Sequence, residues 1–247
     1  MKECIIIQAR LSSTRYPGKV LEPFFEKKSI LEIQLETIAK VCPDLKLVVA
    51  TSTNTADNVL EAFCKSKGVD CFRGSEDNVL QRFVACAKYF DAQKIIRICS
   101  DNPFLIGDSL LTLIEASRKD DSDYISFKNA ENTPAIKTHW GFFAEVVKVE
   151  ALKSALALTE DSFYHEHVTN YIYGHPEMFR VKFLNAPKEV FKRNDLRLTI
   201  DTPIDFEVAQ TLYPLWDKKS LKNLIDLVDA NATLKQSMKV GIDQFSK

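Results

Sequence analysis

Ten residues near the start of the chain contain three cations and three Ser or Thr hydroxyl groups. A polyphosphate requires this mixture, because hydroxyl and backbone N–H donors satisfy its oxygens while Arg and Lys offset its charge. The pair Pro17-Gly18 predicts a turn inside the segment. We therefore predict a phosphate-binding loop over residues 10–19, and a merely solvated basic connection is the alternative. The cations are Arg10, Arg15 and Lys19, and the hydroxyl groups are those of Ser12, Ser13 and Thr14.

Two aspartates follow apolar runs that are typical of buried strands. Asp101 comes after residues 94–99, and Asp201 comes after residues 196–200. If those strands are neighbours, the two carboxylates converge, and carboxylates with retained waters are the ligands that Mg²⁺ prefers. Each aspartate alone is weak evidence, since Asp-Asn-Pro and Asp-Thr-Pro also begin turns and helices. Together they predict a magnesium site.

Short β-branched runs alternate with longer amphipathic segments in the first half of the chain. This alternation predicts right-handed crossovers and a Rossmann-like α/β fold, with a mostly parallel sheet and helices on both faces. Ligands of such sheets lie beyond the carboxyl ends of the strands, where the loop and both aspartates are expected. The predicted strands cover residues 4–7, 46–51, 69–72, 94–99 and 123–127, and the helices residues 29–41, 56–67, 78–90 and 108–118.

The alternation loosens after residue 129, and no linker rich in Gly, Ser or Pro precedes this region. We expect a single domain over residues 1–247, with a small insertion subdomain at residues 129–185. The region contains extended pieces at 136–149 and 178–184 and helices at 150–158 and 163–173. A strand at 196–200, a helix at 203–213 and two terminal helices beyond Trp216 are expected to follow.

Composition excludes several classes of protein. The 247 residues carry 33 basic and 34 acidic side chains, a balance that provides no basic face for nucleic acid. No apolar run approaches membrane-spanning length, and the short one near the N-terminus does not predict a signal peptide. The six cysteines contain no C-x-x-C pair and read as buried thiols. We therefore expect a cytoplasmic protein without a membrane or nucleic-acid partner.

Glycine patterns exclude two common nucleotide-binding classes. The chain has seven glycines and contains neither G-x-x-x-x-G-K-[ST] nor G-x-G-x-x-G. A P-loop ATPase and a Rossmann dehydrogenase both depend on such motifs to bring the backbone close to phosphate. The phosphate-binding loop predicted here must instead depend on side chains.

The loop and its flanks carry a resemblance to a known family. Residues 8–21, QARLSSTRYPGKVL, resemble the N-terminal signature of the cytidylyltransferases that activate acidic sugars, the acylneuraminate and 3-deoxy-manno-octulosonate cytidylyltransferases. They resemble more closely the relatives named for spore-coat polysaccharide biosynthesis. The resemblance implies the nucleotide-diphospho-sugar transferase fold and a loop that wraps a triphosphate. It also implies that Arg10 and Lys19 contact phosphate and that backbone near Ala9 recognises the base.

Three further segments strengthen the resemblance. Residues 100–107, SDNPFLIG, are similar to the family's G-D-x-P-L-I, and residues 197–206, RLTIDTPIDF, are similar to its V-D-T-P-E-D-L. These matches imply that Asp101 and Asp201 bind magnesium, although Ser100 and Phe104 replace the family's usual Gly and Leu. Residues 71–83, CFRGSEDNVLQRF, resemble its V-F-R-G-S-E-D-D-V-L-x-R-[FY]. That match implies that the base and ribose are bordered by Arg73, Gly74, Ser75 and Arg82.

The acceptor side is less distinct. Residues 139–147, HWGFFAEVV, align loosely with the family's P-x-G-x-D-x-E-V-F and retain Gly141 and Glu145, while Phe143 replaces its Asp. Residues 164–169, YHEHVT, resemble R-E-H-V-T, which implies that His167 helps to position the acceptor. The departure at Phe143 leaves the identity of the acceptor open.

The combined expectation is a magnesium-dependent enzyme, because a loop that binds triphosphate lies beside two carboxylates. It would transfer CMP from CTP to a sugar or sugar acid for polysaccharide or glycan biosynthesis, with Arg10, Lys19, Asp101 and Asp201 as catalytic residues. The resemblance also implies a homodimer. Two alternatives stay open: a glycosyltransferase using a D-x-D within residues 120–123, and a non-catalytic nucleotide-binding protein.

Overall fold

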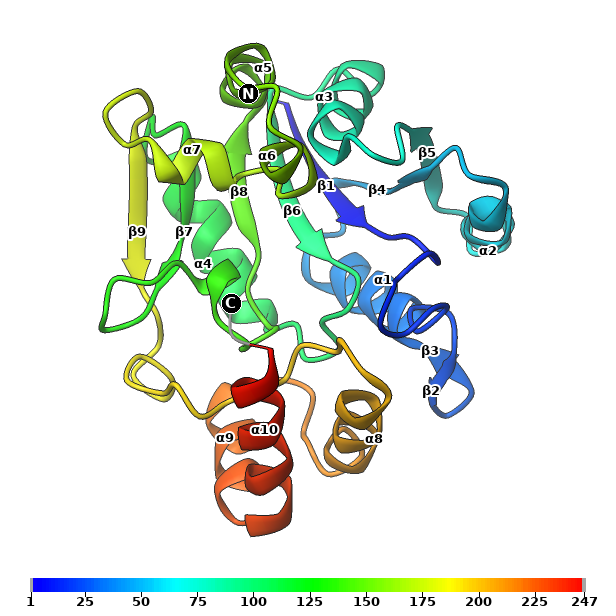
Figure 1. The fold of residues 1–247 in the computed structure, drawn as a ribbon, viewed down its shortest axis with the longest axis vertical. Helices are drawn as coiled ribbons and strands as arrows, with labels where there is room; N and C mark the ends of the chain where they lie inside the picture. Colours follow the sequence, from blue (N-terminus) through cyan, green and yellow to red (C-terminus); the bar gives the residue numbers. More distant parts are fainter. Residues whose placement is uncertain (1, 246–247) are drawn as a thin grey trace.

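A seven-stranded sheet runs through the centre of the computed structural model, which describes residues 2–245 (Figure 1). Its strand order is β5-β4-β1-β6-β8-β7-β9. Every strand is parallel to the others except β8, which is antiparallel to both β6 and β7. The predicted α/β fold with a mostly parallel sheet is therefore confirmed. The strands are β1 (Glu3–Gln8), β4 (Lys46–Ser52), β5 (Asp70–Gly74), β6 (Lys94–Cys99), β7 (Tyr124–Lys128), β8 (Glu145–Lys148) and β9 (Val181–Asn185).

Helices cover both faces of the sheet, as predicted. On β1, Ile5 and Ile7 pack into one apolar cluster, whereas Cys4 and Ile6 pack into a second cluster on the opposite face. Because both faces are buried, the strand reads as a continuous apolar run. The first cluster contains residues of α1 (Ile30–Val41), α2 (Asn58–Ser66) and α4 (Gly107–Arg118). The second contains residues of α3 (Val79–Tyr89), α5 (Val149–Leu158) and α7 (Asn170–Gly174).

The helix predicted over residues 163–173 is two short helices, α6 (Ser162–Glu166) and α7. The N–H of His167 bonds the carbonyl of Phe163 and ends α6. The chain then turns inward, since Val168 is fully buried and the Thr169 hydroxyl donates to Glu145. Burial of this turn in the second cluster outweighs the tendency to continue a single helix. Residues 129–185 also supply β8 and β9 to the central sheet.

The strand predicted at residues 196–200 is not formed, and this prediction was wrong. The segment is buried, but its backbone bonds two loops: the N–H of Leu198 reaches the carbonyl of His139 at 2.8 Å, and that of Ile200 reaches the carbonyl of Asp101 at 3.0 Å. Both edges of β6 are already paired, with β1 and β8, so no ladder position beside it is left. The segment crosses the carboxyl ends of the strands instead of extending the sheet.

Beyond these carboxyl ends lie the last helices, α8 (Pro203–Leu212), α9 (Leu221–Asp229) and α10 (Ala232–Gln244) (Figure 1). A short hairpin of β2 (Pro23–Phe25) and β3 (Lys28–Ser29) follows the phosphate-binding loop. The Ser29 side chain caps α1 by accepting the N–H of Glu32 at 3.2 Å, as expected from the sequence. Within residues 2–245, no helix is both long and apolar enough to span a bilayer.

Phe104 provides a test of how the loop after β6 is anchored. Its side chain is fully buried, with ring centroids of Tyr213 and Trp216 at 5.7 and 5.6 Å. We expect Phe104→Ala to lower the free energy of unfolding by about 3–5 kcal/mol, because the rings that pack on it stay behind around a cavity. Chemical denaturation would measure this. Leu215→Ala, at a position 61% exposed, is the control and should change stability by about 0.5 kcal/mol or less. Equal effects would contradict the interpretation.

Candidate active site

Lys19 lines a cavity of about 180 Å³ beyond the ends of β1 and β6. Its ammonium group is 3.4 Å from Asp101 Oδ2 and 4.0 Å from Asp201 Oδ1, and it donates to the carbonyl of Ile200. The two predicted metal ligands therefore converge, although the second arrives on a crossing segment and not on a strand. The side chain of Lys19 is buried, so both carboxylates compensate a charge that water scarcely reaches. The lining residues are Gln8, Arg10, Ser13, Arg15, Lys19, Val20, Cys99, Ser100, Asp101 and Asp201.

The loop that carries Lys19 is fixed at both ends. Gly18 has a φ of +77° and donates its N–H to the carbonyl of Leu11 at 3.1 Å, which closes the loop. The N–H of Leu11 in turn donates to the buried carboxylate of Asp57 at 2.8 Å. Burial opposes ionisation of Asp57, but hydrogen bonds from Ser52 and Leu11 outweigh it and hold the pKa of the carboxyl below its usual range. Asp57 thus anchors the loop that is predicted to bind phosphate, through its hydrogen bond from Leu11.

Asp201 is surrounded by cations. Besides Lys19, its carboxylate contacts Arg15 at 2.9 Å and Arg197 at 3.3 Å. Arg197 is buried and also binds both carboxylate oxygens of Asp205, at 2.7 and 2.8 Å. Burial would raise the pKa of Asp205, but the hydrogen bonds and charge of Arg197 bring it below its usual value. This fork fixes Asp201 in place, since the same guanidinium holds both aspartates.

The C-terminal helix reaches this cluster, which the sequence did not predict. The ring centroid of Phe245 lies 5.2 Å from the guanidinium carbon of Arg15 and 5.3 Å from that of Arg197. A Cβ on Gly241 would lie 2.7 Å from Cδ and Nε of Arg197. Glycine inside a helix is unfavourable, so its presence there was the available signal for a close approach. The helix α10 therefore packs directly behind the arginine that holds Asp201.

The residues predicted for the base occupy two different settings. Arg82 is fully buried and donates through Nη1 to the carbonyl of Ser75 at 2.8 Å, while its Nε and Nη2 have no hydrogen-bond partner among the described residues. Burial, with a smaller contribution from Arg10, lowers the pKa of Arg82 to about 10. A Cβ on Gly74 would lie 2.9 Å from Arg82 Cγ, so glycine gives this side chain its place. Two buried donors without acceptors are costly, which favours completion by a ligand.

Arg73 is turned away from the cavity. Its guanidinium donates to the carbonyls of Ser52 and Asn54 and to the side chains of Asn58 and Glu61. These acceptors come from the end of β4 and from α2, so Arg73 fastens that helix to the sheet. Its predicted place in the nucleotide site is not supported by these contacts.

The remaining predicted loop residues are distributed around the cavity. Ser13 lines it, whereas Thr14 is exposed and is not among the lining residues. Ala9 is buried, and its N–H donates to the carbonyl of Ala50 at 3.2 Å. Arg10 pairs with Glu166 of α6 at 3.2 Å, and both side chains are partly exposed. Helix α6 thus lies beside the phosphate-binding loop.

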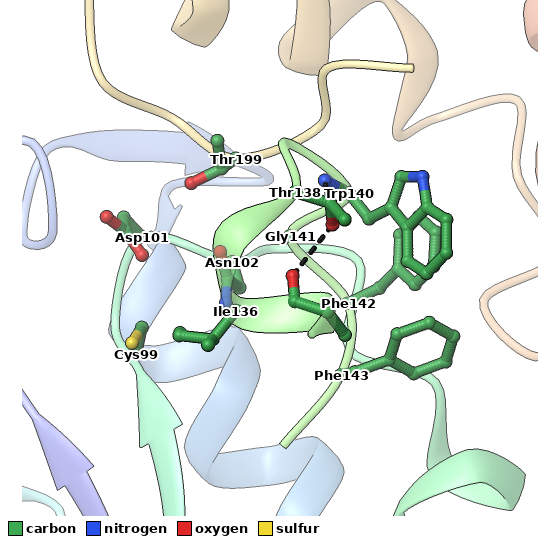
Figure 2. Close-up of a pocket in the computed structure, with 11 residues that line it drawn as sticks. Cys99, Asp101, Asn102, Ile136, Thr138, Trp140, Gly141, Phe142, Phe143 and Thr199 are labelled. Atoms are coloured by element: carbon green, nitrogen blue, oxygen red, sulfur yellow. Dashed lines mark hydrogen bonds between the residues drawn. The ribbon is translucent and has the colours of Figure 1, made fainter. Parts of the chain in front are cut away.

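A second, smaller cavity of about 80 Å³ adjoins the first, and Cys99 and Asp101 line both. Figure 2 shows Asp101 and Thr199 on one side of it and the aromatic rings of residues 140, 142 and 143 on the other. Gly141 lines this cavity with a φ of +68°, and a Cβ there would lie 2.5 Å from the backbone N of Thr199. Glycine at this position lets the loop lie directly against the segment that leads to Asp201.

The other two predicted acceptor residues lie elsewhere. Glu145 is 2% exposed, and its carboxylate accepts hydrogen bonds from Arg97, Tyr124 and Thr169. Both carboxylate oxygens of Glu145 are bonded inside the protein, and neither is accessible to an acceptor. This corrects the predicted acceptor-binding role of Glu145. His167 is exposed at the end of α6, with its ring against Phe163 at 4.6 Å.

The acidic run at residues 120–123 lies at the opposite end of the sheet. It precedes β7, so it stands at the amino edge, whereas Asp101 follows the carboxyl end of β6. Asp120 pairs with Lys182, and Asp121 pairs with Lys148 and Arg180. This run therefore does not supply the D-x-D site of a glycosyltransferase to the cavity.

Asp101 and Asp201 are the candidate metal ligands. Within the part of the chain that the structure describes, no group of three or more His, Cys, Asp or Glu side chains could hold a metal ion. A pair of carboxylates fits Mg²⁺, which commonly takes one or two carboxylates and completes its shell with water and substrate phosphates. The ammonium of Lys19 between them shows that this place already accommodates positive charge.

Comparison with known proteins decides the family. The family model described as cytidylyltransferase matches residues 4–239. The chain belongs to the cytidylyltransferase family. It is 40% identical over 235 residues to the spore coat polysaccharide biosynthesis protein SpsF of Bacillus subtilis, covering 92% of this chain and 93% of that protein. It is 37% identical over 237 residues to an uncharacterised protein of Methanocaldococcus jannaschii, covering 95% and 93%.

Solved structures agree with this assignment. A cytidylyltransferase from Leptospira borgpetersenii has a TM-score of 0.83 at 27% identity, covering 96% of this chain and 97% of its own. A CMP:2-keto-3-deoxy-manno-octonic acid synthetase complexed with CTP has a TM-score of 0.64 at 16% identity, covering 87% and 99%, and supports the fold alone. The family and the nucleotide-diphospho-sugar transferase fold predicted from the sequence are both confirmed.

Gly141 allows a test of the contact between the two loops. We expect Gly141→Ala to lower the free energy of unfolding by about 2 kcal/mol or more, because the new Cβ meets the Thr199 backbone and φ is unfavourable for alanine. Gly174→Ala is the matched control, since the nearest atom to its Cβ would be 3.9 Å away. Thermal or denaturant unfolding of both variants would measure the difference, and similar stabilities would contradict this explanation for Gly141.

Proposed function

We propose that this cytidylyltransferase moves CMP from CTP to a hydroxyl group of a sugar or sugar acid and releases pyrophosphate, in the biosynthesis of a polysaccharide or glycan. The observation that carries the proposal is the meeting of Asp101 and Asp201 at Lys19, under a loop rich in cations and hydroxyls. A relative that is 40% identical adds support, because it is named for spore coat polysaccharide biosynthesis.

Magnesium is the cofactor that we propose for Asp101 and Asp201. When bound, Mg²⁺ neutralises charge on a phosphate and lowers the pKa of a hydroxyl group near it. Arg197 and Arg15 keep the Asp201 carboxylate oriented through their contacts at 3.3 and 2.9 Å. Lys19 contacts both carboxylates and is available to the phosphates of CTP on the open side of the cavity.

The loop cations serve the departing pyrophosphate in this proposal. The acceptor oxygen forms a bond to the α-phosphorus, the bond from that phosphorus to the oxygen bridging to the β-phosphate breaks, and the hydroxyl proton passes to solvent. Arg10 and Lys19 stabilise the charge that develops on the leaving group. Arg10 pairs with Glu166 across partly exposed surface, a contact of about 0–1 kcal/mol, so a triphosphate can recruit it at little cost.

Base and acceptor have distinct places. The sequence resemblance places Arg82 beside the base, and the edge of cytosine provides oxygen and nitrogen acceptors for such a donor. The small cavity beside Asp101 combines hydroxyl groups of Thr138 and Thr199 with an aromatic wall, a lining suited to one hydroxyl-bearing part of a sugar. The homodimer implied by the sequence resemblance stays a prediction, which the molecular mass in solution would test.

A thermal-shift panel of CTP, UTP, GTP and ATP, with and without Mg²⁺, tests the nucleotide assignment. We expect CTP to stabilise the protein and Mg²⁺ to increase the effect, because a ligand at about a hundred times its dissociation constant adds about 2.7 kcal/mol. Sugar acids would then be screened with CTP for release of pyrophosphate. Stabilisation by nucleoside diphosphate sugars, with none by triphosphates, would contradict the proposal.

Asp101→Asn and Asp201→Asn test the carboxylate pair. Each should reduce turnover by about 10²–10³-fold, because each removes charge that acts mainly in the transition state. Asp121→Asn is the control, since Asp121 forms its ion pairs at the amino edge of the sheet, and it should retain turnover. Melting of the unliganded variants would identify any loss of folded protein. Near-normal turnover in both site variants would refute the assignment.

A further inference from the structure

Gln8 is a polar residue of the cavity for which the proposed reaction has so far given no role. It ends β1, lies beside Cys99 of β6, and accepts the N–H of Ser100 through its backbone carbonyl at 3.1 Å. Gln8 lines the cavity together with Arg10 and Asp101. Gln8 therefore stands one strand away from the carboxylate pair.

The orientation of the Gln8 amide is determined by Arg97. Nε and Nη2 of Arg97 both donate to Oε1 of Gln8, at 3.2 and 2.8 Å. The oxygen and nitrogen of an amide are usually hard to distinguish, but a guanidinium group has only donors and no acceptor. The oxygen of Gln8 must face Arg97, and the two N–H donors must point away from it.

Arg97 is itself held in position from the other side. Its Nη1 donates to Oε2 of Glu145, and Oε1 of Glu145 accepts from the hydroxyls of Tyr124 and Thr169. Burial opposes the charge of Arg97, yet Cys99 and Glu145 raise its pKa above the ordinary value. The arginine thus stays charged and in one orientation, between Gln8 on one side and Glu145 on the other.

The ion pair of Arg97 and Glu145 adds little to the stability of the fold. Arg97 is 7% exposed and Glu145 2%, and a buried ion pair is often matched or exceeded in stability by apolar residues of similar volume. What the pair does provide is a fixed partner for one side chain that reaches the cavity. Gln8 lines the cavity together with Arg10, Asp101 and Asp201, so a ligand in the cavity would meet it.

We propose that the amide N–H groups of Gln8 bind an oxygen of a substrate at the reacting centre, and that Arg97 and Glu145 are positioning residues for this contact. The inference rests on the proposed function. The oxygen belongs either to the α-phosphate of CTP or to the acceptor, because Cys99, the strand partner of Gln8, lines both cavities together with Asp101. Both sources offer the same chemistry, an oxygen acceptor for a neutral N–H donor.

Gln8→Glu separates this role from a structural one. The variant keeps the shape of the side chain and its contact with Arg97, but it replaces the donor with a second acceptor. We expect unchanged melting of the unliganded protein together with a loss of about 10- to 100-fold in kcat/KM, the size expected for a hydrogen bond to a charged or polarised oxygen. Gln8→Leu removes both contacts and should show the same kinetic loss.

Binding measurements identify the source of the oxygen. Calorimetry with CTP and Mg²⁺ would show weaker binding in both variants if the contact is to the α-phosphate. Unchanged CTP affinity with a raised KM for the sugar acid identified by the pyrophosphate screen would indicate the acceptor. Wild-type CTP affinity and wild-type kcat/KM in both variants would overturn the proposal. A wild-type chain without any response to CTP and Mg²⁺ would instead contradict the proposed function.

Arg97→Lys tests positioning. The lysine keeps a positive charge beside Glu145 but lacks the two guanidinium donors that hold the Gln8 amide. It should therefore weaken whichever is weakened by Gln8→Leu, the affinity for CTP or the KM for the acceptor. Combined with Gln8→Leu, it should add little further loss of binding, because both changes remove one contact. Leu152→Ala, in the fully buried part of α5, lowers stability without touching this network and is the matched control. Additive losses of binding in the double variant would show that Arg97 affects binding independently of Gln8, and would overturn its assignment as a positioning residue.

Discussion

The pairing of the Lys19 ammonium with two carboxylates is the interaction on which the rest of the site depends. A charge with so little access to water is tolerated only where opposite charges and hydrogen-bond acceptors are fixed around it. Asp101 supplies one carboxylate at the end of β6. The segment that ends at Asp201 supplies the second carboxylate and the carbonyl of Ile200. The architecture follows from this need. Parallel strands bring the first carboxylate and the loop to one edge, and the crossing segment at residues 196–200 closes over them.

That crossing segment depends in turn on contacts far away in the sequence. It is held by the carbonyls of His139 and Asp101, and it lies so close to the loop before β8 that glycine is required at position 141. Arg197 then joins Asp201 to the start of α8, and α10 packs behind it through Gly241. The C-terminal helices therefore belong to the site as supports. Helix α10 therefore packs against a residue that holds the cavity in shape, although most of the sequence separates α10 from Lys19.

Local patterns explain why some of this was predictable. Residues 94–99 form a strand with the expected bounds, and the basic loop lies at the carboxyl edge as the alternation of strands and helices required. The wrong predictions share a cause. Residues 196–200 have the composition of a strand, but both edges of β6 were occupied. Arg73 and Glu145 have the chemistry of site residues, but their partners come from distant segments. Pairing across a sheet is set by tertiary contacts, which a single sequence does not specify.

Two buried ion pairs lie near the carboxyl edge of the sheet. Arg97 with Glu145 lies behind Gln8, and Arg197 with Asp205 lies behind Asp201. In each case a guanidinium that is almost wholly buried directs donors at one side chain of the cavity. Ion pairs of this kind contribute little net stability, since desolvation offsets most of the attraction. Their value lies in geometry, because a site held by rigid charged forks does not have to reorganise when charge develops on a substrate. These buried ion pairs thus lie beside the cavity, where a phosphoryl-transfer site needs fixed dipoles and charges.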